Sequence, residues 1–231
     1  MSEKETRDEL LVKTVEAFKE LDRDFSSSGK KIMSELEPFL DRLRTRQADY
    51  DLFKLAYIDF REKFSQALAQ TASIVKEMKF PFVTLGDKLY SLFAYLGLVE
   101  SLGNTMTDIL VMLLVSNDRD LHVESRYSTP HVKHVESIKE LEDERIPLAT
   151  KVNFLRDNGI KEFASIIDCK LRNVIAHLKF QVKDNEIYIR KKPASSFLRT
   201  NMRKLVYSTI IVAISILELA EAKGLTKEKK E

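Results

Sequence analysis

The sequence predicts an all-α protein, because apolar residues recur at helical spacing along most of the chain and Gly and Pro are scarce. Its 231 residues include 6 Gly and 5 Pro, and 44% of them are hydrophobic. A chain of this length and apolar content can bury the core of one large domain or two small ones. We therefore expect a bundle of helices rather than a turn-rich β fold.

The first third of the chain is charged and amphipathic. Helices are predicted over residues 6–25, 31–46 and 49–78, with a break at "SSSGKK" (26–31) and an end before Pro81, which cannot continue a helix. The chain becomes more apolar after Gly86 and Asp87, so a soft domain boundary is placed near residue 82. We expect an N-terminal helical segment over 1–82, a second helical bundle over 83–224 and a solvated tail over 225–231.

The second part is predicted to hold a long helix over 88–115, a polar loop over 118–130, and helices over 132–144, 147–156, 161–177 and 195–223. "DNG" at 157–159 is a helix stop, and Gly224 caps the last helix. Residues 180–189 alternate apolar and polar around "KDNE". This pattern predicts a short β-hairpin with Asn185 in a left-handed conformation.

Composition and charge exclude several classes of protein. Charged residues make up 32% of the chain but nearly cancel to a net charge of +2, which alone favours neither nucleic acid nor membrane. The single cysteine, Cys169, excludes an intramolecular disulfide framework and is typical of a reducing compartment. The N-terminus lacks the apolar core of a signal peptide, and the most apolar run, 205–217, is short and followed by Glu218. We expect a soluble, cytoplasmic protein.

The helix predicted over 161–177 carries the residues with the clearest chemistry. On a helical wheel one side is an apolar, core-facing stripe of Leu171, Val174, Ile175 and Leu178, and the other half holds Arg172, Asn173, Ala176 and His177. Histidine titrates near neutral pH and can move a proton during phosphodiester cleavage. Arginine binds phosphate oxygens bidentately, and asparagine can orient the imidazole or bind phosphate. RNA supplies its own nucleophile, the 2′-hydroxyl, so we expect neither metal nor cofactor.

The stretch "LRNVIAH" (171–177), followed by "FQVKDNEIYI", resembles the signature of HEPN domains, in which Arg, a polar residue and a later His lie on one helix of a small all-α bundle. The resemblance covers about residues 84–222. It implies a metal-independent endoribonuclease with Arg172, Asn173 and His177 as catalytic residues, leaving 2′,3′-cyclic phosphate and 5′-hydroxyl ends. It also implies a homodimer whose motif helices share one cleft, and a role as a toxin with an antitoxin partner or in another defence system.

Two other interpretations stay open from the same residues. The chain could be a non-catalytic module that binds a nucleotide or a protein partner, as some members of the family are, with the long N-terminal helices recruiting that partner. It could also be a purely structural helical dimer, in which the polar face of the motif helix makes ordinary hydrogen bonds.

Further residues support or compete with the RNA-cleaving hypothesis. Residues 179–204 hold eight Lys or Arg and two Asp or Glu, which predicts a basic edge for RNA including Lys179, Arg190, Lys191 and Lys192, or else a solvated hairpin. Glu100, Asn104 and Asp108 recur every four residues and form either a polar seam that supports the cleft or the dimer contact, or an exposed stripe.

The remaining candidates each have a simpler explanation. His131 and His134 are spaced like metal ligands but lack further ligands nearby, so we expect them to be surface histidines. Cys169 is expected to pack as a small side chain rather than to act as a nucleophile. Tyr127 and Tyr188 could stack on bases, although packing explains both as well.

Overall fold

The computed structural model describes residues 3–77, 84–125, 128–133, 135, 137–143 and 146–224, with side chains described for all of these except 3–18, 48, 75–77, 122–125, 128–133 and 143. The protein is predominantly α-helical, as the sequence predicts. The helices are α1 (Glu3–Thr45), α2 (Gln47–Glu77), α3 (Leu85–Leu98), the π-helix η1 (Val99–Gly103), α4 (Asn104–Val115), α5 (Ile138–Asp143), α6 (Leu148–Asp157), α7 (Lys161–Ile166), α8 (Cys169–Ala176), the 3₁₀ turn η2 (Ala194–Ser196) and α9 (Leu198–Ala222).

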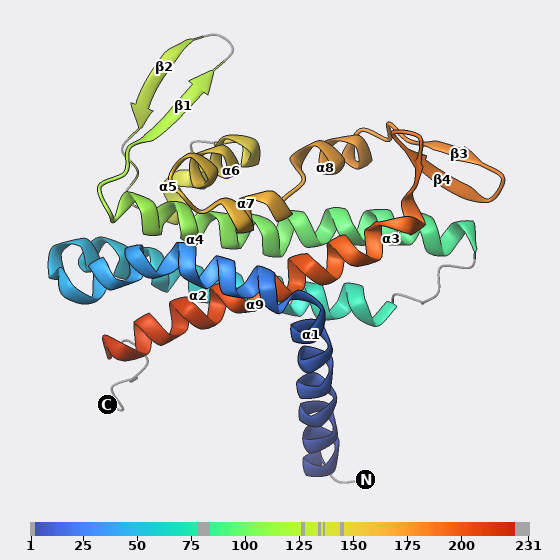
Figure 1. Ribbon diagram of the computed structural model, residues 1–231, viewed down its shortest axis with the longest axis horizontal. Helices are drawn as coiled ribbons and strands as arrows, with labels where there is room; N and C mark the ends of the chain where they lie inside the picture. The colour runs from blue at the N-terminus through green and yellow to red at the C-terminus, as the bar shows by residue number, and fades with distance from the viewer. Residues whose placement is uncertain are drawn as a thin grey trace.

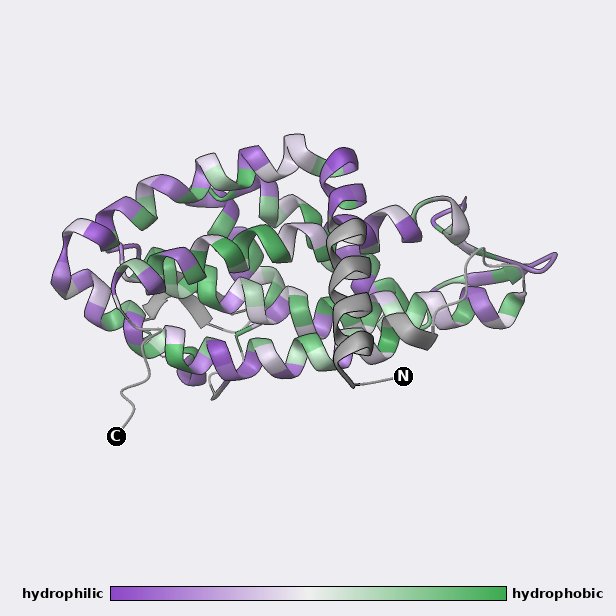
Figure 2. Ribbon diagram, turned by 90° about the horizontal axis from the view of Figure 1, so that it is seen from below, coloured by the Kyte–Doolittle hydropathy of each residue, from purple (hydrophilic) through white to green (hydrophobic). Residues whose placement is uncertain are grey.

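The helices pack on both sides of one central rod. The run α3–η1–α4 forms this rod, with α5 to α8 on one side of it and α1, α2 and α9 on the other (Figure 1). Apolar stretches, green in Figure 2, gather on the inner helices, and hydrophilic stretches line the outer ones. Because α8 lies in an outer layer, one of its faces meets no other helix that the structure describes (Figure 1).

Two long apolar stretches of this bundle have the length and composition of membrane spans, residues 85–115 and 198–222. In the most apolar 18-residue window of each stretch, 72% of the window is buried in the first and 61% in the second. Core helices of soluble proteins meet the same criteria of length and composition, so this burial agrees with the soluble protein that the sequence predicts.

The predicted break at 26–31 is wrong, because α1 continues through it. Ser28 and Gly29 are buried where α1 crosses α9, and a Cβ on Gly29 would lie 2.6 Å from the Tyr207 hydroxyl. The small residues in "SSSGKK" therefore permit a close crossing of two helices and do not end a helix. Tyr207 donates a hydrogen bond to Asp22 at 2.6 Å, which further ties α9 to α1.

The polar segment predicted as a loop over 118–130 is instead a β-hairpin, β1 (Leu121–Ser125) paired antiparallel with β2 (Ser128–Lys133). The helix predicted over 132–144 shortens accordingly to α5. The hairpin predicted after the motif helix is confirmed as β3 (Gln181–Lys183) and β4 (Glu186–Ile189), to which β5 (Lys192–Pro193) adds. Asp184 and Asn185 have φ of 51° and 59°, as a two-residue turn of this twist requires.

The single helix predicted over 161–177 is divided into α7 and α8. Ile167 leaves the helical conformation and is 3% exposed, with its Cδ1 3.1 Å from where a Cβ on Gly103 would lie. The side chain of Asp168 then accepts a hydrogen bond from the Leu171 amide at 2.8 Å and starts α8. The break follows from one buried isoleucine that packs on a glycine and one helix-capping aspartate.

The hydrophobic core is continuous from the N-terminal helices to the C-terminal one. One cluster of buried side chains includes Ile32 of α1, Phe53 of α2, Leu92 of α3 and Leu205 of α9. The boundary placed near residue 82 falls in 78–83, and with the predicted tail over 225–231 it lies outside the described residues. On either side of it, the described helices share this one core.

Candidate functional site

The motif helix α8 is held at both ends by local backbone chemistry. Asp168 caps its start, and at its end Leu178 and Lys179 donate to the carbonyls of Ile175 and Val174 at 3.0 and 2.8 Å. This is a Schellman arrangement, which requires a left-handed residue that is usually glycine. Here that residue is Leu178, with φ of 52°. Leu178 is consequently 62% exposed, so its predicted place in the core stripe is wrong.

Arg172 is the best-fixed residue of the motif. Its Nε and Nη2 contact the carboxylate of Glu100 on η1, and its Nη1 donates to Asn173 Oδ1 at 2.9 Å. These contacts occupy three of the five N–H groups of the guanidinium and leave two that can bind a further anion. The structure thus brings together three of the predicted site residues, Arg172, Asn173 and Glu100.

His177 is not brought together with Arg172 inside one chain. It follows the last residue of α8, its side chain is exposed, and it makes no side-chain hydrogen bond to any residue that the structure describes. Five residues along a helix correspond to a rise of about 7.5 Å and a turn of about 140°, so the two side chains leave α8 in different directions. Asn173 and His177, four apart, lie on nearly the same side.

The rest of the predicted polar seam, half-buried Asn104 and buried Asp108, fixes α6 to α4. Lys151 of α6 donates to Asn104 Oδ1 at 2.8 Å and to Asp108 Oδ1 at 2.5 Å, and its side chain is 3% exposed. Burial raises the pKa of Asp108 above its ordinary value, although the neighbouring ammonium of Lys151 opposes that shift. Asn104 and Asp108 are thus tied to α6 by Lys151, while Glu100 is exposed and contacts Arg172 instead.

Arg172 and Asn173 also line a pocket of about 200 Å³ between α8 and the start of α6, together with Cys169, Pro147, Leu148 and Ala149. The N-terminus of α6 has no side-chain cap, and its first two residues, Leu148 and Ala149, line this pocket. Burial raises the pKa of the Cys169 thiol, which argues against a reactive thiolate. The pocket is lined by groups that favour an anion: a guanidinium, an amide and a helix N-terminus.

The basic edge lies at the hairpin end of the molecule. Lys179, Arg190, Lys191 and Lys192 are all exposed, and none of them forms an ion pair with a residue in the described part of the chain. Lys88 of α3 fixes the hairpin by bonding Asn185 O at 2.6 Å and Glu186 at 3.0 Å. The unpaired charges are therefore presented on an anchored element. Tyr188 is half-buried in β4.

Sequence reasoning missed two residues that position this site. Lys151 belongs to the seam but looks like any helix lysine in the sequence, and nothing local indicates its burial. Asp168 could have been found, because an aspartate directly before a helical pattern is a common start signal. The side chains of His131, His134 and Tyr127 lie outside the described residues; elsewhere in the described part, no three His, Cys, Asp or Glu side chains gather as metal ligands would.

No family model, curated protein or solved structure matches this chain.

Proposed function

We propose that this protein is a metal-independent endoribonuclease of the HEPN type, cytoplasmic, and active as a homodimer in a toxin or defence system. One observation supports this most strongly. Arg172 is oriented by Glu100 and Asn173 on a solvent-facing helix, and it keeps two N–H groups beside a pocket whose other wall is an uncapped helix N-terminus. Such a pocket suits a phosphate.

The proposal requires two copies of the chain. Cleavage through the 2′-hydroxyl needs one group to accept its proton and one to protonate the leaving 5′-oxygen. His177 directly follows α8, and helical spacing places it about 140° around the helix from Arg172 of the same chain. The free face of α8 carries Asn173 and Ala176 with His177 directly after them, so two α8 helices meeting across a two-fold axis bring two imidazoles to one cleft.

The mechanism then follows from residue chemistry. One His177 removes the proton of the 2′-hydroxyl as its oxygen attacks phosphorus, and the other gives a proton to the 5′-oxygen as the P–O bond breaks. The products are a 2′,3′-cyclic phosphate and a 5′-hydroxyl. Arg172 stabilises the charge on the pentacoordinate phosphate, and Asn173 orients the phosphate or the imidazole.

A second candidate is a non-catalytic module that binds a nucleotide or a protein partner. The closed contact between Arg172 and Glu100 favours it, because a guanidinium already neutralised by a carboxylate gains less from a scissile phosphate. In that case the basic edge and the pocket bind a phosphate without cleaving.

The deciding experiment incubates the full chain with single-stranded RNA in EDTA, beside His177→Ala, Arg172→Ala and the exposed control Lys170→Ala. We expect cyclic-phosphate ends from the wild type and the control, and a loss of about 100-fold or more in rate in both site variants. Cleavage that persists in both site variants rejects the site. Phosphate or nucleotide binding without cleavage selects the second candidate, and a monomer by light scattering rejects the shared cleft.

A further inference from the structure

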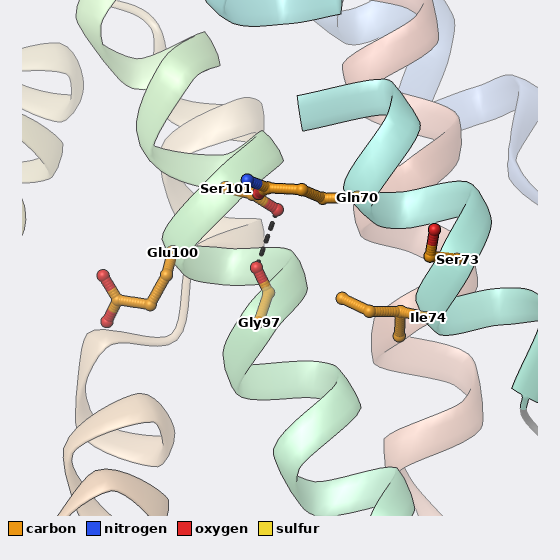
Figure 3. A pocket seen from close by; sticks show the side chains of 6 residues that line it. All are labelled: Gln70, Ser73, Ile74, Gly97, Glu100 and Ser101. Carbon is orange, nitrogen blue, oxygen red and sulfur yellow. Dashed lines mark hydrogen bonds between the residues drawn. The ribbon is translucent and has the colours of Figure 1, made fainter. Parts of the chain in front are cut away.

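A larger pocket, of about 460 Å³, lies against the other flank of Glu100. Gln70, Ser73 and Ile74 of α2 line one side, and Gly97, Glu100 and Ser101 of α3 and η1 line the other. Figure 3 shows the Glu100 side chain pointing away from Ser73 and Ile74, while Gln70 reaches across towards Ser101. Glu100 therefore lies between this pocket and Arg172, since its carboxylate contacts the guanidinium.

The lining of this pocket has the chemistry of a nucleobase site. The Gln70 amide has a donor and an acceptor and makes no hydrogen bond to the part of the chain that is described. The hydroxyls of Ser73 and Ser101 donate to their own helices, at 3.1 and 2.7 Å, and keep lone pairs that can accept. Ile74 supplies an apolar surface of the kind on which the flat face of a base packs.

The floor of the pocket depends on a missing side chain. A Cβ on Gly97 would lie 3.0 Å from Ile74 Cδ1, so any larger residue at 97 displaces Ile74 or fills the space. The adjoining π-helix η1 places Ser101 on this side while Glu100 faces α8 (Figure 3). Helical segments of the π type are frequent at functional sites, where they re-aim side chains.

We propose that this pocket binds the nucleobase of an RNA residue next to the scissile phosphate, with Gln70 reading its hydrogen-bonding edge. The inference rests on the proposed function, because the phosphate at Arg172 fixes where the base must lie. Single-stranded RNA presents unstacked bases that proteins recognise by such amide contacts and apolar packing. This base pocket gives α2 a role as one wall of the substrate site.

The test uses DNA oligonucleotides that contain one ribonucleotide, so that cleavage through a 2′-hydroxyl occurs at one phosphate. The base on either side of that phosphate is A, C, G, U or absent. Three variants are compared with the wild type: Gln70→Ala removes the reading amide, Ser73→Phe fills the pocket, and Gln66→Ala changes the same residue type one turn earlier on α2, outside the pocket.

We expect the wild type to prefer certain bases at one of the two positions. Gln70→Ala should reduce that preference in kcat/KM by up to about tenfold, the size that corresponds to one net hydrogen bond. Ser73→Phe should raise KM for base-bearing substrates to the value for the abasic one, and Gln66→Ala should match the wild type. If both pocket variants keep the base ranking and the KM of the wild type, the inference is overturned and the proposed function is left intact.

A binding measurement separates this inference from the proposed function. Fluorescence anisotropy with an all-deoxy oligonucleotide measures occupancy without cleavage. Suppose that the wild type cleaves none of the ribonucleotide-containing substrates. If Ser73→Phe then weakens binding of the all-deoxy oligonucleotide about tenfold and Gln66→Ala does not, the base pocket stands and the nuclease proposal fails. Equal binding by all three variants and the wild type overturns the pocket.

Discussion

The guanidinium of Arg172 on α8 contacts the carboxylate of Glu100 on η1, across 72 positions of sequence. This contact connects the motif helix to the central rod of the bundle. It also fixes the direction of the one permanently charged side chain in the motif. The function proposed for Arg172 therefore depends on a residue outside the motif.

The first prediction concerns that orientation. Glu100→Ala should lower kcat for RNA about 100-fold while the fold is kept, because displacing a catalytic group by about 1 Å has effects of that size. Glu100→Gln keeps an oxygen that accepts from Arg172 Nε, so it should lose less. Single-turnover cleavage measures both, and full activity in Glu100→Ala would show that the contact does not position Arg172.

The second prediction concerns the basic edge. Lys179→Ala and Lys192→Ala should weaken RNA binding for all sequences alike, and each should reduce the slope of log K against log salt by about 0.7. Fluorescence anisotropy from about 50 to about 300 mM salt, a range that spans weak to strong screening, measures the slope. Lys30→Ala on α1, also exposed, is the matched control. An unchanged slope in both edge variants excludes this edge from the interface.

The third prediction concerns Leu178. A leucine with φ of 52° carries a steric cost of about 1 kcal/mol that a glycine avoids. Because its side chain is exposed, Leu178→Gly should raise the free energy of unfolding by about 0.5 kcal/mol after allowance for the more flexible unfolded chain. Leu178→Ala keeps the Cβ and should give no gain. Urea unfolding compares the two, and a glycine variant less stable than the alanine variant contradicts the interpretation.

The fourth prediction concerns the buried pair of Lys151 and Asp108. Lys151→Met should reduce the free energy of unfolding by about 3–5 kcal/mol, because it leaves Asp108 buried without its cation. The double variant Lys151→Met with Asp108→Leu should recover most of this loss. The measurement is a double-mutant cycle by urea unfolding at pH 7. Additive effects of the two substitutions would mean that the side chains are not coupled.

The fifth prediction concerns pH. The hydrogen bond from Ser28, with further help from Lys204, holds the pKa of Glu162 below its ordinary 4.5. A lowered pKa in the folded state contributes stability above about pH 4.5, and this contribution is lost as pH falls through the folded pKa. Glu162→Gln lacks this carboxylate, so its free energy of unfolding should fall less than that of the wild type between about pH 6 and about pH 3. Glu218→Gln on the exposed side of α9 should behave as the wild type.

Sequence periodicity was enough to predict the helical class, α2, α6, α9 and the hairpin after α8, because each has a clear repeat of apolar positions or a clear turn signal. It failed where tertiary contacts decide. "SSSGKK" has the composition of a break, yet Gly29 packs against Tyr207 inside α1. Ile167 continues the apolar pattern, yet its packing against Gly103 divides the motif helix in two.

The site was predictable in its residues and less so in its geometry. Arg172 and Asn173 lie together as helical spacing requires, and the four-residue repeat of Glu100, Asn104 and Asp108 indicated a seam. The buried partner of that seam, Lys151, comes from a different helix and leaves no local trace in the sequence. The separation of His177 from Arg172 follows from their spacing, because five residues along a helix correspond to a turn of about 140°.

The π-helix at Val99–Gly103 makes the length of this segment a constraint in its own right. Removing one residue from it would let the rod close into an ordinary α-helix at little cost to the backbone. A π-helical turn holds one residue more than an α-helical turn, so the parts of the rod before and after the deletion would keep nearly the same relative rotation. Asp108 would still face Lys151, but the directions of Glu100 and Ser101 within the turn would change, so the deletion should affect the contact with Arg172 more than the fold.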